Sequence, residues 1–585
     1  MKDKIFALTD FKFSGTVTET DFDGVYVRFD GKDATIGFKT LSQKARAYFL
    51  LSMKAKGGAF EISEKPCFDT LGPMLDMSRG KVMTVDGVCR FIDNIASLGM
   101  NMLMLYTEDT YEIKERPQFG YLRGRYTEDE LKTIDGYAKS MGVELIPCIQ
   151  TFGHLEQYLK NPEGKPLRDN ERVLLAGCEE VYEFIEQEIA AVRRCFTTDR
   201  VHLGMDETFN LGLGNYLKQN GYRNQTDIYN EHLARVLEIS GKYFDKPMIW
   251  SDMVTTPHDV KLYSTEYTPD REFIDGVPKG VDLVFWDYYH DRYDWYKKNI
   301  DNHHLFGSNV LFGGGVWTWN GIVPNFEFTL KTTKPALEAC IDGGVKEVVA
   351  TMWVSGGSGA DYAQALPGLA VFSEYCYHGK ECTEEDIFEV SEHLTGVDRE
   401  LFFAISDIYL GQRSASSLAT AFLHSDILLN LTHYDVDYEN AKTIFAKARD
   451  TILSKDYKHS GFFAKMYDIA IDRADIFANL KTAYKTDNRE YMKEAAETIL
   501  PRLALNTREF YKMHKKLWYT DYKGNGMENY SHDFGGTILR IEDAIELISD
   551  YLDGKTDRID ALAEDTLDGF NLSWRTPSSY ISVMR

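Results

Sequence analysis

The sequence predicts an α/β fold, a (β/α)8 barrel with a small α/β unit before it and an all-helical region after it. Between about residues 66 and 380, eight short apolar runs alternate with amphipathic helical stretches, which is typical of such a barrel. A doubly wound sheet is the rival arrangement, but it needs an early glycine-rich phosphate turn that the sequence lacks. No proline occurs between Pro367 and Pro501, which favours long helices there. We therefore expect units at residues 1–65, 66–380 and 381–585.

The elements of each unit follow from the spacing of apolar residues. Residues 16–29 alternate and are interrupted by Asp23-Gly24, which predicts a β-hairpin, and residues 41–53 have helical spacing. The expected barrel strands are 74–77, 102–106, 144–149, 201–204, 248–250, 283–286, 310–312 and 347–352. The expected helices are 85–98, 127–141, 179–191 and 227–243 in the barrel, and 440–454, 462–484 and 489–515 in the last unit.

Composition narrows the classes of function. The chain of 585 residues carries a formal net charge of −25, which disfavours nucleic acid and an anionic membrane surface as partners, because both need a basic face. No stretch reaches the ~20 apolar residues of a membrane span, and the first residues lack a signal-peptide core. The eight cysteines are scattered without a Cys-x-x-Cys pair. We expect no metal, no cofactor and a cytoplasmic location.

Two neighbouring acids end the fourth expected strand, in the segment VHLGMDET. Barrel active sites lie at the carboxyl ends of the strands, so Asp206 and Glu207 are candidate catalytic residues. Adjacent strand residues point to opposite faces, which suits them poorly as the acid and nucleophile of an ordinary retaining glycosidase. They suit a division of labour in which Glu207 protonates the leaving oxygen and Asp206 holds a substrate group that acts as the nucleophile.

Other polar residues end the first three strands. His154 follows the third strand, and Glu108 and Asp109 follow the second. A Glu108–His154–Glu207 chain would tune the pKa and orientation of the acid. Arg79, just past the first strand, could grip adjacent sugar hydroxyls with its two parallel donors.

Aromatic residues gather at the remaining strand ends and suggest walls for a sugar ring. They are Trp250, Trp286, Trp317, Trp319 and Trp353, five of the eight tryptophans in the chain. By strand alternation Tyr288 shares a face with Trp286, whereas Tyr289 faces away unless the strand has already ended.

These motifs resemble glycoside hydrolase family 20, the β-N-acetylhexosaminidases. LDMSRG at 75–80, LYTED at 105–109, TFGH at 151–154 and HLGMDE at 202–207 are similar to family segments in order and spacing. The units flanking the barrel resemble a bacterial, intracellular-type branch. The resemblance implies an exo-acting retaining enzyme that removes terminal β-linked GlcNAc or GalNAc, with the 2-acetamido oxygen of the substrate forming an oxazoline. We expect a carbohydrate partner and a homodimer.

The resemblance also implies roles for the residues that match. Glu207 would be the general acid and base, Asp206 would orient the acetamido group, and Arg79 would bind O3 and O4. His154 with Glu108 would support Glu207. Three tryptophans would form the walls of the pocket: Trp250, Trp286 and Trp353. A tyrosine would donate to the acetamido oxygen, and we expect Tyr288 in this role, with Tyr289 as the alternative.

This chain departs from the family pattern at three places. Met205 replaces the second glycine of the signature, and Phe152 replaces a proline. After Trp353, where the family usually has an acid for O4 or O6, no acid occurs until Asp361. The outer end of the pocket could therefore accept a substituted or extended sugar.

Three other readings stay open. A glycosidase with a covalent carboxylate nucleophile would use Asp287 or Asp252 and would not need a 2-acetamido group. A carbohydrate-binding protein would lack catalysis, although the intact acid pair argues against it. A metal hydrolase would bring together His202, His154 and Asp206, but the sequence has no His-x-His or HExxH spacing.

Overall fold

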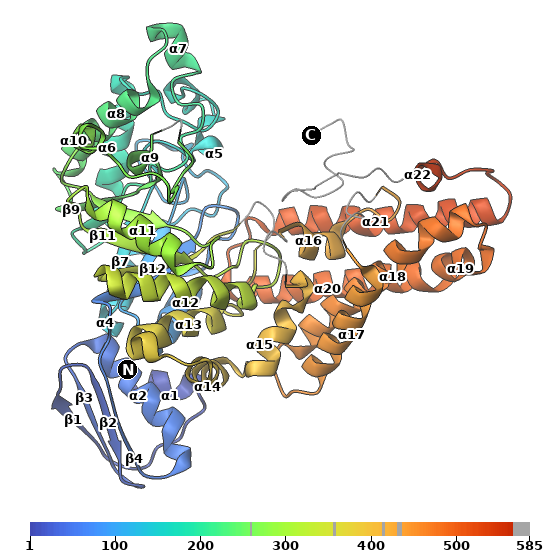
Figure 1. Ribbon diagram of the computed structural model, residues 1–585, viewed down its shortest axis with the longest axis horizontal. Coiled ribbons are helices and arrows are strands. Elements are labelled where there is room, and N and C mark those ends of the chain that lie inside the picture. The colour runs from blue at the N-terminus through green and yellow to red at the C-terminus, as the bar shows by residue number, and fades with distance from the viewer. Residues whose placement is uncertain (258–259, 355–358, 412–415, 430–435, 566–585) are drawn as a thin grey trace.

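The computed structural model describes residues 1–257, 260–354, 359–411, 416–429 and 436–565. A barrel forms one body of the molecule, a small sheet packs at one end of it, and helices extend to one side (Figure 1). Among the described helices, none has the length and apolar character needed to cross a membrane.

Eight parallel strands close the predicted barrel. Each strand pairs with the next along the chain, and the last pairs back with the first from Glu347 opposite Thr70 to Met352 opposite Leu75. The strands are β5 (Thr70–Asp76), β6 (Met102–Tyr106), β7 (Glu144–Cys148), β8 (Arg200–His202), β9 (Lys246–Trp250), β10 (Asp282–Trp286), β11 (Val310–Gly315) and β12 (Glu347–Met352). The (β/α)8 fold is confirmed.

Helices and short helical turns surround the barrel. They are α3 (Val85–Ser97), α4 (Glu128–Met141), α5 (Glu156–Leu159), η2 (Lys165–Leu167), α6 (Glu179–Arg193), α7 (Asn215–Asn220), α8 (Gln225–Ser240), α9 (Asp252–Thr255), α10 (Arg271–Gly276), α11 (Tyr293–His304), α12 (Phe326–Gly343) and α13 (Leu366–His378). Their ends carry local signals. Thr127 caps α4 in a capping box with Glu130, and Gly142 ends this helix in the left-handed conformation.

The barrel interior is filled by side chains, so it is a core rather than a channel. Methionines from three strands contribute to it, and Tyr106 and Trp250 are the last residues of their strands. The cluster comprises Met74, Met102, Met104, Tyr106, Ile146, Cys148, Met248, Trp250, Val284, Leu311 and Val349.

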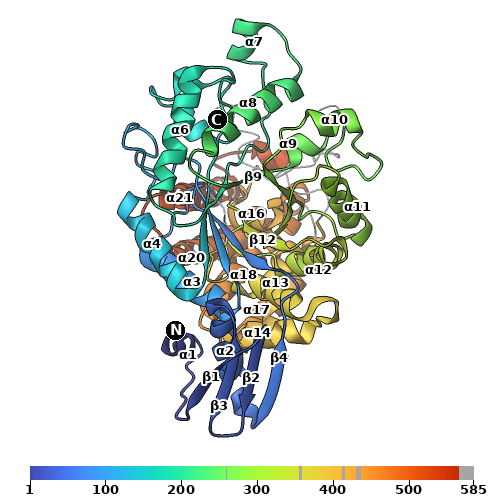
Figure 2. The same cartoon turned by 90° about the vertical axis from the view of Figure 1, so that its left-hand side faces the viewer.

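The first unit has a four-stranded sheet with the order β1-β3-β2-β4, seen at the bottom of Figure 2. Its elements are α1 (Lys2–Leu8), β1 (Val17–Asp21), β2 (Val25–Phe29), β3 (Ala34–Phe38), α2 (Leu41–Lys54), η1 (Ala55–Gly57) and β4 (Phe60–Glu64). The predicted hairpin over residues 16–29 is wrong, because β3 lies between β1 and β2. Burial explains this: β2 buries Val25, Val27 and Phe29 and takes a central place, whereas the exposed β1 stays at the edge.

A buried arginine fastens this unit to the barrel. The Arg46 side chain is fully buried and pairs with Glu64 at 2.5 Å and with Glu374 at 2.9 Å. Its guanidinium also lies 3.9 Å from the ring centre of Tyr377. Removing one member would leave a buried charge unpaired, so this cluster fixes how α2 and α13 pack.

The last region is helical, as predicted. Its elements are η3 (Gly379–Glu381), α14 (Glu384–Thr395), α15 (Arg399–Ser406), η4 (Asp407–Tyr409), α16 (Ser416–His424), α17 (Tyr438–Leu453), α18 (Ser460–Lys485), α19 (Arg489–Glu494), η5 (Ala495–Ile499), α20 (Leu500–Asp521), α21 (Met527–Leu552) and α22 (Asp560–Ala563). The expected helix 489–515 contains the wider π-turn η5 just before Pro501. A proline cannot donate to the helix and clashes with the preceding turn, and a π-turn relieves that conflict.

Candidate active site

The two expected catalytic acids lie on a turn rather than on the strand. β8 ends before them, and the chain continues through Gly204, Met205 and Glu207 with φ of 73°, 74° and 44°. Only glycine fits at 204, because a Cβ there would lie 2.3 Å from Gln150 Oε1. The expectation that the neighbouring acids point to opposite faces is therefore wrong. With the strand ended, both approach the imidazole of His154.

Met205 has a positive φ of 74°, a backbone conformation that favours glycine. This accounts for the glycine of the family signature at this position. A side chain in this region costs about 1–2 kcal/mol. Two hydrogen bonds hold the residue in place. Its N–H donates to Gln150 Oε1 at 3.1 Å, and its C=O accepts from Tyr229 Oη at 3.0 Å. The strained turn is thus maintained beside the acids.

A single imidazole nitrogen lies between the two carboxylates. His154 Nε2 is 3.2 Å from Asp206 Oδ2 and 3.5 Å from Glu207 Oε2, and Gln150 Nε2 donates to Asp206 Oδ1 at 2.7 Å. Burial acts to raise the pKa of Asp206, but His154 and Gln150 outweigh it and lower that pKa to about 2. Burial and the charge of Asp206 raise the pKa of Glu207. The environment therefore moves the two pKa values apart: it favours the ionised form of Asp206 and the protonated form of Glu207.

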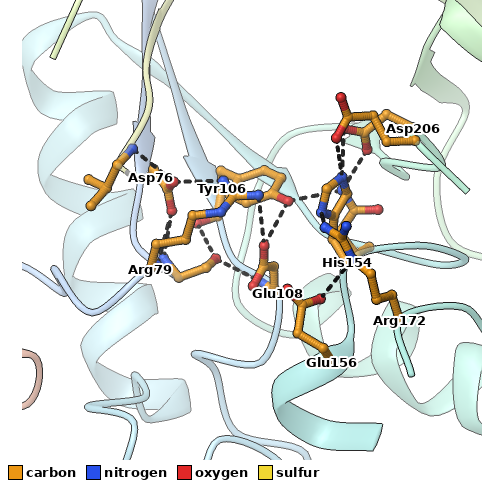
Figure 3. A network of polar contacts seen from close by, with 12 residues as sticks. Asp76, Arg79, Tyr106, Glu108, His154, Glu156, Arg172 and Asp206 are labelled. Atoms are coloured by element: carbon orange, nitrogen blue, oxygen red, sulfur yellow. Dashed lines mark hydrogen bonds and ion pairs between the residues drawn. The ribbon is translucent and has the colours of Figure 1, made fainter. Parts of the chain in front are cut away.

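The far side of His154 faces a cation instead of the expected carboxylate. His154 Nδ1 lies 3.4 Å from Arg172 Nη2, as Figure 3 shows. Burial opposes the charged imidazole, but Asp206 more than offsets it and raises the pKa of His154. The positive charge of Arg79 acts in the opposite sense and lowers this pKa. Glu108 makes its contacts elsewhere, so the direct Glu108–His154–Glu207 chain is not formed among the described residues.

Glu108 belongs to a network around Arg79 (Figure 3). It accepts from Tyr106 Oη at 3.0 Å and pairs with Arg79 Nη2 at 3.2 Å. Asp76 Oδ2 pairs with Arg79 Nη1 at 2.8 Å, so two carboxylates fix the guanidinium. Burial, partly offset by Arg79, raises the pKa of Glu108 to about 7. Asp109 turns away and pairs with Arg123 at 3.1 Å.

Asp252, which follows the fifth strand, supports both the acid and an aromatic wall. Its Oδ2 accepts from the Glu207 backbone N–H at 3.0 Å, and its Oδ1 accepts from Trp286 Nε1 at 3.2 Å. Burial and the nearby Asp206 raise the pKa of Asp252 to about 7. Trp250 is 1% exposed and belongs to the barrel core, with its ring centre 4.3 Å from that of His202 and 5.8 Å from that of Trp353.

The remaining aromatic residues form a second, stacked layer. Trp317 is 2% exposed and donates from Nε1 to the Tyr288 C=O at 3.1 Å, so it supports Tyr288 from behind. The Tyr288 ring stacks on that of Trp286 with centres 5.6 Å apart. Tyr289 is more open, with 43% of its surface exposed. Trp353 lies edge-on to the ring of Tyr106, with ring centres 4.8 Å apart. Its buried Nε1 has no hydrogen-bond partner among the described residues.

The loop after the eighth strand falls partly outside the described residues, because 355–358 are among those not described. Asp361 accepts from the backbone N–H groups of Ala363 and Gln364 at 2.9 and 3.1 Å. It therefore stabilises the turn before α13.

The metal-hydrolase reading finds no support in the described part of the chain. His202, His154 and Asp206 do not converge as a ligand set. His202 Nδ1 instead accepts from the Gly204 N–H at 3.0 Å.

Sequence reasoning missed Arg172, Gln150 and Asp76, and it named Asp252 only as a candidate covalent nucleophile, not as a partner of Glu207. Three of them carried a signal, because Asp76, Gln150 and Asp252 each stand at or just beyond a strand end. Arg172 lies in a loop far from any strand end, and only the folded chain brings it to His154.

Comparisons with known proteins show which family the chain is similar to. Residues 68–293 match the model of the glycosyl hydrolase family 20 catalytic domain, and residues 406–574 match that of the glycoside hydrolase 20C C-terminal domain. Human hexosaminidase D is 25% identical over 209 residues, 33% of this chain and 39% of that protein. Bovine hexosaminidase D is 26% identical over 201 residues, 33% of this chain and 55% of its own length. The matched segment thus spans roughly half or less of these relatives.

A solved structure shows a similar fold over most of the molecule. The Flavobacterium johnsoniae chitobiase covers 93% of this chain and 92% of its own, at 15% identity and a TM-score of 0.53. Two family models match successive parts of one chain, the barrel and the helical region. The chain therefore belongs to glycoside hydrolase family 20.

Proposed function

We propose that the protein is an exo-acting, retaining β-N-acetylhexosaminidase that removes terminal β-linked GlcNAc or GalNAc by substrate-assisted catalysis. The observation that carries the proposal is the pair of acids on one imidazole nitrogen, with the pKa of Asp206 lowered to about 2 and that of Glu207 raised. Family membership supports the same chemistry.

The roles of the two acids follow from their environments. Glu207, which favours its proton, donates it to the glycosidic oxygen as the bond to the anomeric carbon breaks. The acetamido oxygen of the substrate attacks that carbon, and Asp206, held ionised, stabilises the positive charge on the acetamido nitrogen. Glu207 then removes a proton from the water that opens the oxazoline, and so returns to its starting state.

Arg79 is fixed to bind substrate. Asp76 and Glu108 hold two of its nitrogens, and 25% of the side chain stays exposed. The exposed donors suit the adjacent O3 and O4 hydroxyls of a sugar. Trp286, Trp353 and Tyr288 line the ring and the acetamido group, and Trp250 and Trp317 back them.

The buried contacts of Asp252 and Asp287 favour an internal nucleophile over a protein carboxylate. Asp252 already accepts two hydrogen bonds. Asp287 accepts from Trp295 Nε1 at 2.6 Å and from the Tyr289 N–H at 2.8 Å. Both oxygens of each carboxylate thus already accept a hydrogen bond from the protein.

The test compares aryl β-GlcNAc, β-GalNAc and β-glucoside as substrates. We expect only the 2-acetamido sugars to be hydrolysed. Glu207→Gln, assayed in addition on a disaccharide ending in β-GlcNAc, should lose about 10²–10⁴-fold in kcat. Asp206→Ala should lose activity on all of these substrates. Equal hydrolysis of the glucoside would establish a covalent nucleophile instead. Sugar binding without hydrolysis would establish a carbohydrate-binding protein.

We further propose a cytoplasmic location and a homodimer. All eight cysteines are free thiols, which is typical of a reducing compartment. Cell fractionation tests the location, and sedimentation of the purified protein tests the dimer.

A further inference from the structure

Lys81 is a buried lysine whose charge is balanced in an unusual way. It is 1% exposed, and its Nζ donates to the C=O groups of Gly359, at 3.0 Å, and Ala360. Among the described residues, no carboxylate lies within ion-pair distance of it. The ammonium lies over the rings of Tyr362 and Tyr522, 5.1 and 4.9 Å from their centres. Burying a charge without an ion pair costs free energy, and the two carbonyl groups and the two aromatic rings offset that cost.

The backbone that Lys81 holds leads directly to the sugar-binding arginine. Gly359 and Ala360 belong to the loop after β12. Two residues further on, Tyr362 Oη donates to the Asp76 C=O at 2.7 Å. The Asp76 carboxylate pairs with Arg79 at 2.8 Å and accepts from the Val354 N–H at 3.1 Å. Lys81 thus joins the loops that follow the first and last barrel strands, on either side of Arg79.

The helical region completes this arrangement through the turn between α20 and α21. Tyr522 Oη accepts from the Tyr362 N–H at 2.9 Å, and Tyr530 Oη donates to the Gly359 C=O at 3.4 Å. The turn packs closely, because a Cβ at Gly526 would lie 1.6 Å from the Gly80 oxygen. The helical region therefore touches the same backbone that Lys81 holds.

We propose that Lys81 is a positioning residue through which the helical region fixes Arg79 for sugar binding. The inference rests on the proposed function, because it concerns the sugar-binding end of that site. According to this proposal the helical region contributes to substrate affinity, although none of its described contacts reaches Asp206 or Glu207.

The groups around the ammonium predict how the contact responds to pH. Burial lowers the pKa of Lys81 to about 8, and the charge of Asp361 opposes this shift. His514 of α20 also faces it, and burial keeps that imidazole neutral by lowering its pKa to about 3. The phenols of Tyr362 and Tyr522 stay protonated, because burial raises the pKa of both. Lys81 is therefore the group here that changes charge near pH 8.

The test uses Lys81→Met with Lys523→Met as a matched control. Lys523 lies on the turn between α20 and α21 and reaches the barrel from there. Like Lys81 it lies over a tyrosine ring, but it pairs with Glu130 at 2.9 Å. With aryl β-GlcNAc, we expect Lys81→Met to raise KM about tenfold or more with a smaller change in kcat, because Arg79 binds the substrate and its transition state alike. Lys523→Met should leave KM unchanged. Thermal unfolding of both variants measures any common loss of stability.

A pH profile and a conservative variant separate positioning from folding. In the wild type, KM should rise as the pH passes about 8 and Lys81 loses its proton. Lys81→Arg keeps its charge at that pH, so its KM should stay level there. Equal KM values for Lys81→Met and the wild type, or equal shifts in both methionine variants, would overturn the inference. If the wild type itself hydrolyses none of the 2-acetamido substrates, the proposed function fails instead.

Discussion

Asp252→Asn is expected to impair the acid step by displacing Glu207. Asp252 accepts hydrogen bonds from the Glu207 N–H and from Trp286 Nε1 with separate oxygens. An amide has one oxygen, so one of these donors must face an NH2 group. The resulting buried unsatisfied donor costs about 1–3 kcal/mol of folding free energy. Glu207 has a φ of 44°, which this hydrogen bond helps to hold, so the carboxyl should shift.

The expected kinetic effect depends on the leaving group. A displacement of ~1 Å in a catalytic group can cost about 10²-fold in rate. A sugar leaving group needs the proton of Glu207, whereas a dinitrophenolate leaves almost unaided. We expect kcat to fall about 10²-fold on a disaccharide ending in β-GlcNAc and less than about tenfold on the dinitrophenyl glycoside.

Asp109→Asn is the matched control for this prediction. Asp109 is also a buried aspartate near the same rim, but it pairs with Arg123 and does not touch the acid. It should change both substrates equally or not at all. An equal loss on both substrates for Asp252→Asn would refute the reasoning, because it would show that Asp252 does not act through the proton donor.

Three further predictions concern pH, stability and the acetamido contact. The value of kcat/KM should be high where Asp206 is ionised and Glu207 protonated, and should decline as the pH rises through the raised pKa of Glu207; a rate still rising above pH 8 in a pH series would contradict this. Arg46→Met should cost about 3–5 kcal/mol in urea unfolding, because it leaves two buried carboxylates without a cation; a loss below 1 kcal/mol would contradict it. Tyr288→Phe should lower kcat on 2-acetamido sugars about tenfold or more, with Tyr289→Phe measured alongside; the reverse order would assign the contact to Tyr289.

The barrel could be predicted because its signals are local. Strands 102–106 and 347–352 match β6 and β12 residue for residue. A buried parallel strand appears as a short apolar run whatever its neighbours are. The expected hairpin failed for the complementary reason. Which strand pairs with which depends on the burial of the whole sheet, and the turn Asp23-Gly24 does not carry that information.

In the candidate site, too, the sequence predicts which residues lie at the rim but not which residues they contact. The position of Asp206, Glu207, His154 and Arg79 at the rim follows from the rule that barrel sites lie at strand ends. Their partners do not follow from it. Glu108 was expected beside His154 but pairs with Arg79, because the side chain after a strand end can turn toward either neighbouring loop.

The sequence by itself determined the fold and the set of acids and aromatic residues at the barrel rim, because periodicity and strand ends are properties of short segments. Only the tertiary structure decided that Arg172 lies behind His154, that Asp252 accepts from the Glu207 N–H, and that the Lys81 ammonium lies over the Tyr522 ring of the helical region. Each of these contacts joins loops or domains far apart in the chain. Their partners are fixed by how whole elements pack, and no local pattern records that packing.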